Sequence, residues 1–140
     1  MSRSNIEKLA KIFSNRSLPK DDWTHQAHLQ VAFRYNWNYK FDEALRIVRE
    51  LIISYNDSVG TVNSSTSGYH ETLTVFWMII TRNFLTENEH TSVDEAYEEF
   101  LVRSYHLKDL PDLYYSDKVL FSEQARKEWV DGDIKSVLLK

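Results

Sequence analysis

The scarcity of glycine and proline constrains the fold of this chain more than any other feature of the sequence. Only 3 glycines and 2 prolines occur among 140 residues. Tight turns between short strands depend on these two residue types, so a turn-rich β sandwich is a poor match. Long helices that are joined by a few breaks fit this composition better.

Apolar residues recur with helical spacing in five segments of the chain. They predict helices near residues 4–13, 41–55, 69–85 and 92–107, and one that begins between Pro19 and Thr24 and ends near Asn36. The segment 69–85 is apolar nearly all round, which is typical of a helix at the centre of a bundle. Short helical turns follow near residues 113–120 and 122–130. We therefore predict an all-α fold, a bundle of four to five main helices with a C-terminal helical cap, in one domain over residues 1–140.

Several classes of protein do not match this composition. The chain has no cysteine, which excludes disulfides, thiolate catalysis and cysteine-bound metals. No apolar segment typical of a signal peptide follows Met1, and the longest apolar run, Val75 to Ile80, is far shorter than the roughly 20 residues that span a bilayer. The net charge is −4 with both signs interspersed, so no nucleic-acid partner and no membrane association is expected. We expect a cytoplasmic protein, and the sequence does not indicate its oligomeric state.

Three of the five histidines lie where apolar helices are predicted to begin. His25 and His28 are three residues apart, a spacing that makes their side chains neighbours on one helix face. His70 and Glu71 are adjacent, and adjacent side chains on a helix point about 100° apart. We therefore expect His25, His28 and His70 to converge, with Glu71 outside the same set of ligands. Unpaired buried imidazoles are costly, so these rings need partners.

Three interpretations of these histidines stay open. In the first, a pocket between helices binds a divalent metal such as zinc, iron or nickel through His25, His28 and His70 and acts on a small molecule, with Glu71 as base or outer contact. In the second, the histidines belong to a structural network with threonine and tyrosine hydroxyls in a non-catalytic ligand- or protein-binding module. In the third, His70 and Glu71 are a metal-free general acid–base pair. Whether the protein is an enzyme is therefore left open.

The residues around His70 complete the predicted pocket. The polar stretch 56–67 is long for a loop inside a compact domain, and such loops are often functional. Tyr69 follows this loop and is expected at the pocket wall, and Thr74 shares the predicted face of His70, so both are candidate ligand contacts. His90 lies in a polar turn and is expected to be exposed to solvent. His106 is expected to be a cation at a helix end.

Three motifs together resemble those of a family of small, uncharacterised bacterial proteins. They are Thr24-His25-x-x-His28-Leu29, Gly68-Tyr69-His70-Glu71-Thr72-x-Thr74, and the C-terminal series Tyr115-Ser116, Leu120-Phe121-Ser122, Ala125-Arg126 and Trp129-Val130. The resemblance covers almost the whole chain and implies no activity. If the C-terminal motif belongs with the other two, the cap folds over the histidines. Arg126 would then offer a positive charge to an anionic ligand.

Overall fold

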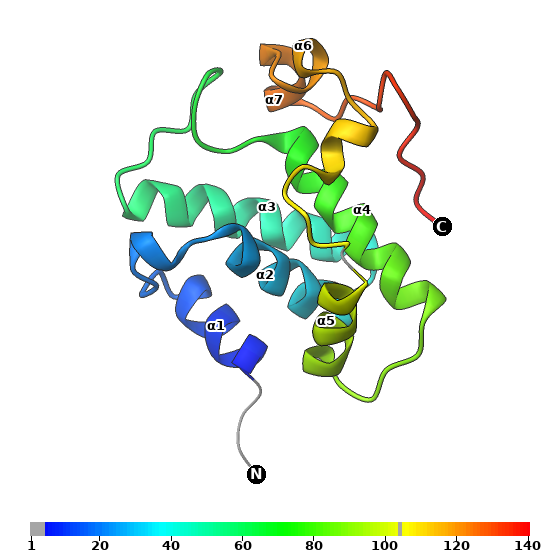
Figure 1. The fold of residues 1–140 in the computed structure, drawn as a ribbon. Coiled ribbons are helices and arrows are strands. Elements are labelled where there is room, and N and C mark those ends of the chain that lie inside the picture. The colour runs from blue at the N-terminus through cyan, green and yellow to red at the C-terminus, as the bar shows by residue number, and fades with distance from the viewer. Residues whose placement is uncertain (1–4, 104) are drawn as a thin grey trace.

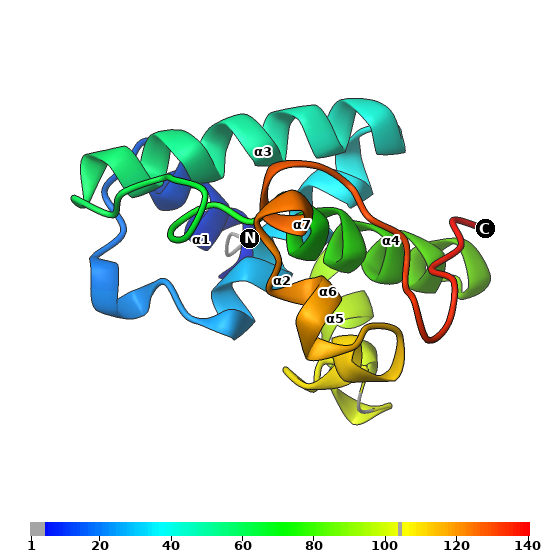
Figure 2. The same ribbon diagram turned by 90° about the horizontal axis from the view of Figure 1, so that it is seen from above.

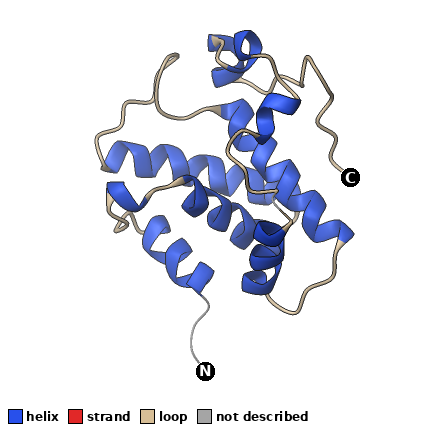
Figure 3. Ribbon diagram, in the orientation of Figure 1, coloured by secondary structure: helices blue, strands red, loops and turns tan. Residues whose placement is uncertain are grey.

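The chain folds into a bundle of helices, shown in Figures 1 and 3. The computed structural model describes residues 5–103 and 105–140, and within these ranges it contains α-helices and 3₁₀ turns but no strand. The elements are α1 (Asn5–Ser14), η1 (Lys20–Asp22), α2 (His25–Asn38), α3 (Phe41–Ser58), α4 (Glu71–Glu87), α5 (Val93–Val102), η2 (Leu110–Leu113), α6 (Asp117–Leu120) and α7 (Glu123–Lys127). The prediction of an all-α fold with four to five main helices and a C-terminal cap is confirmed, with five main helices formed by the described residues.

Two of the helix ends that differ from the predicted ones are those of α3 and α5. Helix α3 continues past the expected end near residue 55 to Ser58. Helix α5 ends at Val102 rather than near residue 107, because the chain turns so that the Tyr105 amide donates to the Phe100 carbonyl at 3.3 Å and the Tyr105 ring contacts Phe84 and Phe100. Residues 4 and 104, which fall in predicted helices, lie outside the described residues.

Helix α4 lies at the centre of the bundle, as its apolar sequence predicts, together with α2, which packs against α1, α3, α4 and α5. It packs against α2, α3 and α7, and its Phe76 and Met78 side chains are fully buried. One face of the core joins α1, α2 and α3 around Phe13 and Tyr55, and another joins α2, α4 and α5 around Phe33 and Phe84. The burial of apolar surface on several faces of one helix is what fixes α4 in this place.

A buried polar contact sets how α2 and α4 lie on each other. Asn36 of α2 is 2% exposed, and its amide donates to the Met78 carbonyl at 3.1 Å and to the Thr81 hydroxyl at 2.8 Å. Its side-chain oxygen accepts from Nε of Arg82 at 3.2 Å. Because a buried amide without partners is costly, these bonds favour one register of α2 against α4.

The C-terminal segment covers the N-terminal end of α4 and then runs back along this helix (Figures 1 and 2). Short helices α6 and α7 form the cap, and beyond them the side chain of Asn83 donates to the Leu138 carbonyl and accepts from the Lys140 amide, both at 2.8 Å. The predicted cap therefore lies where it can contact the His70 segment. None of the helices formed by the described residues is long and apolar enough to cross a bilayer.

Candidate functional site

His70 is the residue that precedes the first turn of α4, and both of its ring nitrogens are bound to backbone. Its backbone is extended, with φ −129° and ψ 107°, and Nδ1 accepts from the Leu73 amide at 3.1 Å, which caps the helix. Nε2 lies 2.8 Å from the Leu120 carbonyl at the end of α6. An amide N–H can only donate and a carbonyl can only accept, so the ring carries its proton on Nε2 and is neutral.

The surroundings of His70 stabilise this neutral form. The residue is 8% exposed, and burial lowers its pKa. The nearby guanidinium of Arg126 lowers the pKa further, although the bond to Leu120 opposes both effects. His70 was predicted to lie inside a helix, on one face with Leu73, Thr74 and Trp77. This placement is wrong, because helix α4 begins at Glu71 and His70 is its cap.

Glu71 begins α4 and is bound by a partner that the sequence analysis did not identify. Nε and Nη2 of Arg49, on α3, donate to its two carboxylate oxygens at 2.8 and 2.6 Å, a bidentate pair. The Tyr69 hydroxyl donates to the same carboxylate at 2.5 Å. The Glu71 side chain is 13% exposed and that of Arg49 is 36% exposed. Burial raises the pKa of Tyr69, as does its bond to Glu71, so the phenol stays protonated.

Thr74 and Arg126, which were also predicted to contact a ligand, form hydrogen bonds to the backbone of residues 68–70. The Thr74 hydroxyl donates to the His70 carbonyl at 2.9 Å. Arg126 of α7 donates from Nη1 to the Gly68 carbonyl at 2.9 Å and to the Tyr69 carbonyl at 3.4 Å. Arg126 thus ties the cap to the residues before α4.

Buried hydroxyls make a second tie between α4 and the cap. Thr72 is fully buried, and its hydroxyl donates to the Glu128 carbonyl at 2.8 Å while accepting from the Val130 amide at 3.1 Å. The Tyr115 hydroxyl donates to the Val130 carbonyl at 2.6 Å. The residues of the central and C-terminal motifs therefore meet in space and bind one another.

The loop between α3 and α4 is held by Asn63. Its side-chain oxygen accepts from the Asn56 amide at 3.0 Å and from the Tyr69 backbone N–H at 2.9 Å, and its amide donates to the Ile53 carbonyl at 3.2 Å. Gly68 has φ +76°, and a Cβ there would lie 2.4 Å from the Val62 carbonyl oxygen. Only glycine fits this close approach. The loop therefore positions the start of α4.

His25 and His28 lie at the start of α2, and each forms a hydrogen bond through one ring nitrogen. Nε2 of His25 donates to the His106 carbonyl at 2.9 Å, and its ring meets Trp77 edge-on. Nδ1 of His28 donates to the Thr24 carbonyl at 2.8 Å, and its ring stacks on Trp23 with centroids 3.6 Å apart. Burial lowers the pKa of His25, and it lowers the pKa of His28 to about 4. Both rings are therefore neutral at pH 7.

The structure does not assemble the predicted set of ligands. His70 is committed through both nitrogens to Leu73 and Leu120, whereas His25 and His28 bind other carbonyls. Over residues 5–103 and 105–140, no group of three or more histidine, aspartate or glutamate side chains is placed to hold a metal ion. A divalent metal therefore stays a prediction without a preformed group of ligands.

The prediction that His90 is exposed is wrong. Its side chain is 1% exposed, and its ring stacks on Phe84 of α4. Nδ1 lies 3.3 Å from Oε2 of Glu99 on α5, yet neither ring nitrogen forms a hydrogen bond within the described chain. The polar composition of this turn pointed to solvent, but α4 and α5 enclose the ring. His106 contributes its backbone carbonyl, which accepts from His25.

Sequence reasoning missed two residues that organise this region, Arg49 and Asn63. Arg49 stands beside the apolar stripe of α3, and a charged residue at such an edge is a weak signal that a carboxylate lies nearby. Asn63 is one of many polar residues in its loop, and nothing in the sequence separates it from its neighbours. Its role depends on where α3 and Tyr69 lie in space.

Comparisons with known proteins identify no relative of this chain. No family model, no curated protein and no solved structure matches it. The resemblance to small bacterial proteins therefore stays a prediction.

Proposed function

We propose that the protein is a non-catalytic ligand-binding module, in which the histidine and tyrosine motifs form a structural network. The main support for this proposal is that both ring nitrogens of His70 form hydrogen bonds. Nδ1 caps α4 and Nε2 binds the Leu120 carbonyl. A general base needs a free lone pair, and a metal ligand needs one as well. His70 offers neither without breaking a bond that holds α4 or the cap.

The contacts of Glu71 support the same proposal. Its two oxygens are bound by Arg49, and Tyr69 donates to one of them. Both oxygens are therefore already bound by donors of this chain, whereas a general base must reach the proton of a substrate. The arrangement joins α3, the loop and α4, which is a structural task.

A metal-binding function is the second candidate, and one observation favours it. Nδ1 of His25 and Nε2 of His28 accept no hydrogen bond from the described residues, so each histidine keeps a lone pair that zinc, iron or nickel could use. Two imidazoles alone make a weak site, because stable protein sites for these metals have three or four protein ligands.

Metal analysis distinguishes the two candidates. We expect protein purified without a His tag, then incubated with zinc, iron(II) or nickel and passed through a desalting column, to retain far less than one metal ion per chain. The double variant His25→Ala/His28→Ala should retain the same small amount, and His90→Ala is a matched control outside the pair. Stoichiometric metal that is lost in the double variant and kept in the control would overturn the non-catalytic proposal in favour of a metal site.

A further inference from the structure

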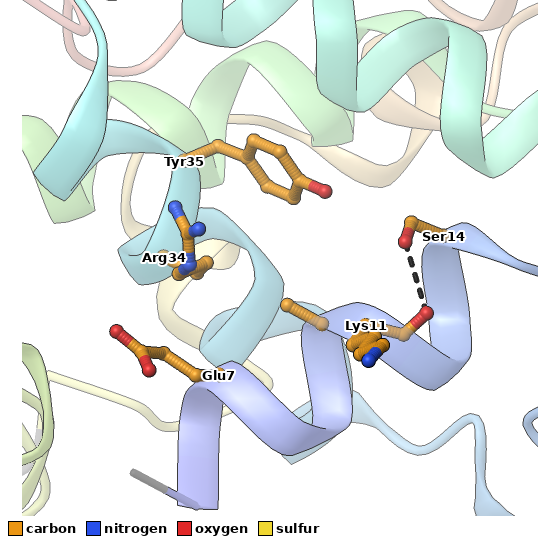
Figure 4. Close-up of a pocket in the computed structure, with 6 residues that line it drawn as sticks. Glu7, Lys11, Ser14, Arg34 and Tyr35 are labelled. Carbon is orange, nitrogen blue, oxygen red and sulfur yellow. Dashed lines mark hydrogen bonds between the residues drawn. The ribbon is translucent and has the colours of Figure 1, made fainter. Parts of the chain in front are cut away.

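A polar groove runs between α1 and α2, away from the histidine motifs (Figure 4). The two helices pack through apolar residues such as Phe13 and Val31, and their outer edges border an open hollow of about 320 Å³. That volume is at the lower end of the range for small-molecule sites, roughly 300–1,000 Å³. The lining residues are Glu7, Ala10, Lys11 and Ser14 of α1 with Arg34 and Tyr35 of α2.

The lining offers two cations from two different helices. Lys11 forms no ion pair with any described residue, and Nη1 of Arg34 is bound to the neutral side chain of Asn38 at 2.5 Å. The Arg34 guanidinium also lies 5.7 Å from the centre of the Tyr35 ring. Glu7 borders the groove as well, so the described lining carries two positive charges and one negative charge.

Two hydroxyls complete the lining. The Tyr35 phenol is half-buried, and burial raises its pKa, so it stays protonated and can donate a hydrogen bond at neutral pH. The Ser14 hydroxyl donates to the Lys11 carbonyl at 2.9 Å, which fixes its oxygen at the end of the groove (Figure 4).

We infer that this groove binds the oxyanion of a small molecule, either a carboxylate or a phosphate. Arg34 offers a planar fork of donors, Lys11 a point charge and Tyr35 a neutral donor, which is a combination suited to an anionic oxygen group. The inference rests on the proposed ligand-binding function and names the class of ligand. Its site is separate from His70, which binds Leu73 and Leu120, and from Glu71, which binds Arg49 and Tyr69.

Titration with simple anions tests the groove. Amide NMR shifts of α1 and α2 are followed as inorganic phosphate, or in a second series acetate, is added to the protein up to about 50 mM, where a dissociation constant of 1–10 mM reaches saturation. Ionic strength is held constant with chloride, because exposed charges are screened by salt. Saturable shifts with either anion support the inference, and the anion that binds tells which oxyanion the groove prefers. No saturable shift with either anion would overturn it.

Matched variants separate binding in the groove from general attraction to positive charge. Lys11→Met and Arg34→Met should each weaken binding about two- to fivefold, the loss expected for one exposed charge contact. Lys8→Met on the exposed side of α1 and Arg46→Met on the exposed side of α3 should leave it unchanged. Equal weakening by the control variants would overturn the inference. A negative result in the titration excludes anion binding in the groove and leaves the non-catalytic proposal untouched. That proposal fails instead if His25 and His28 hold a stoichiometric amount of metal.

Discussion

Replacement of His70 by alanine should be among the most destabilising single changes in this protein. The change removes the acceptor that caps α4 at Leu73, which costs about 1 kcal/mol for a typical cap. It also leaves the Leu120 carbonyl without its donor in a buried place, which costs about 1–3 kcal/mol. The sum is a loss of about 2–4 kcal/mol in the free energy of unfolding.

Urea unfolding followed by far-UV circular dichroism measures this loss, with an unchanged m value as the sign that the folded state keeps its compactness. His70→Asn is the matched variant, because asparagine caps helices well but is too short to replace the bond to Leu120. It should recover about 1 kcal/mol relative to alanine. A loss below about 0.5 kcal/mol for His70→Ala would refute the structural role of the ring. Equal losses for both variants would refute the cap as a separate contribution.

Two further predictions concern titration and ion pairing. Burial lowers the pKa of His28 to about 4 from 6.5, so the unfolded chain takes up a proton that the folded chain rejects, and stability present above pH 6.5 is lost as the pH falls toward 4. Between pH 7 and pH 5, the free energy of unfolding measured in urea should fall by about 1–2 kcal/mol more for the native protein than for His28→Phe, which cannot titrate at this position. Equal decreases for the two proteins would contradict this prediction. For the half-buried pair, a double-mutant cycle with Arg49→Met and Glu71→Gln should give a coupling of about 1–2 kcal/mol, between the values of exposed and buried pairs. Additive losses in that cycle would mean that the two side chains act independently.

The main helices could be predicted because their signals are local. The apolar residues of α3 repeat with the period of a helix, and α4 is apolar nearly all round, so its central position follows from the need to bury every face. The predicted C-terminal cap of short helices is also present, as α6 and α7. Helix ends were less accurate, as α5 shows, because the turn at Tyr105 depends on ring contacts with Phe84 and Phe100.

The sequence predicted that several residues around His70 lie together, but not the contacts that they make. His70, Glu71, Tyr69, Thr74 and Arg126 do lie together, yet they bind one another and the backbone. The sequence predicts His70 in the first turn of a helix over residues 69–85, whereas the helix begins at Glu71 and the His70 ring caps its end. No periodicity in the sequence records that difference.

The sequence by itself determined that this chain is helical, that α4 is central, and that two histidine segments begin helices. These properties follow from residue type and spacing, which act over one or two turns. Only the tertiary structure decided that Glu71 meets Arg49 across 22 residues and that His70 meets Leu120 across 50. Hydrogen bonds and ion pairs depend on distances of a few tenths of an ångström between groups far apart in the chain, and those distances are set by how the helices pack. Of the three histidines predicted as metal ligands, His70 is therefore bound through both ring nitrogens, whereas His25 and His28 are each bound through one.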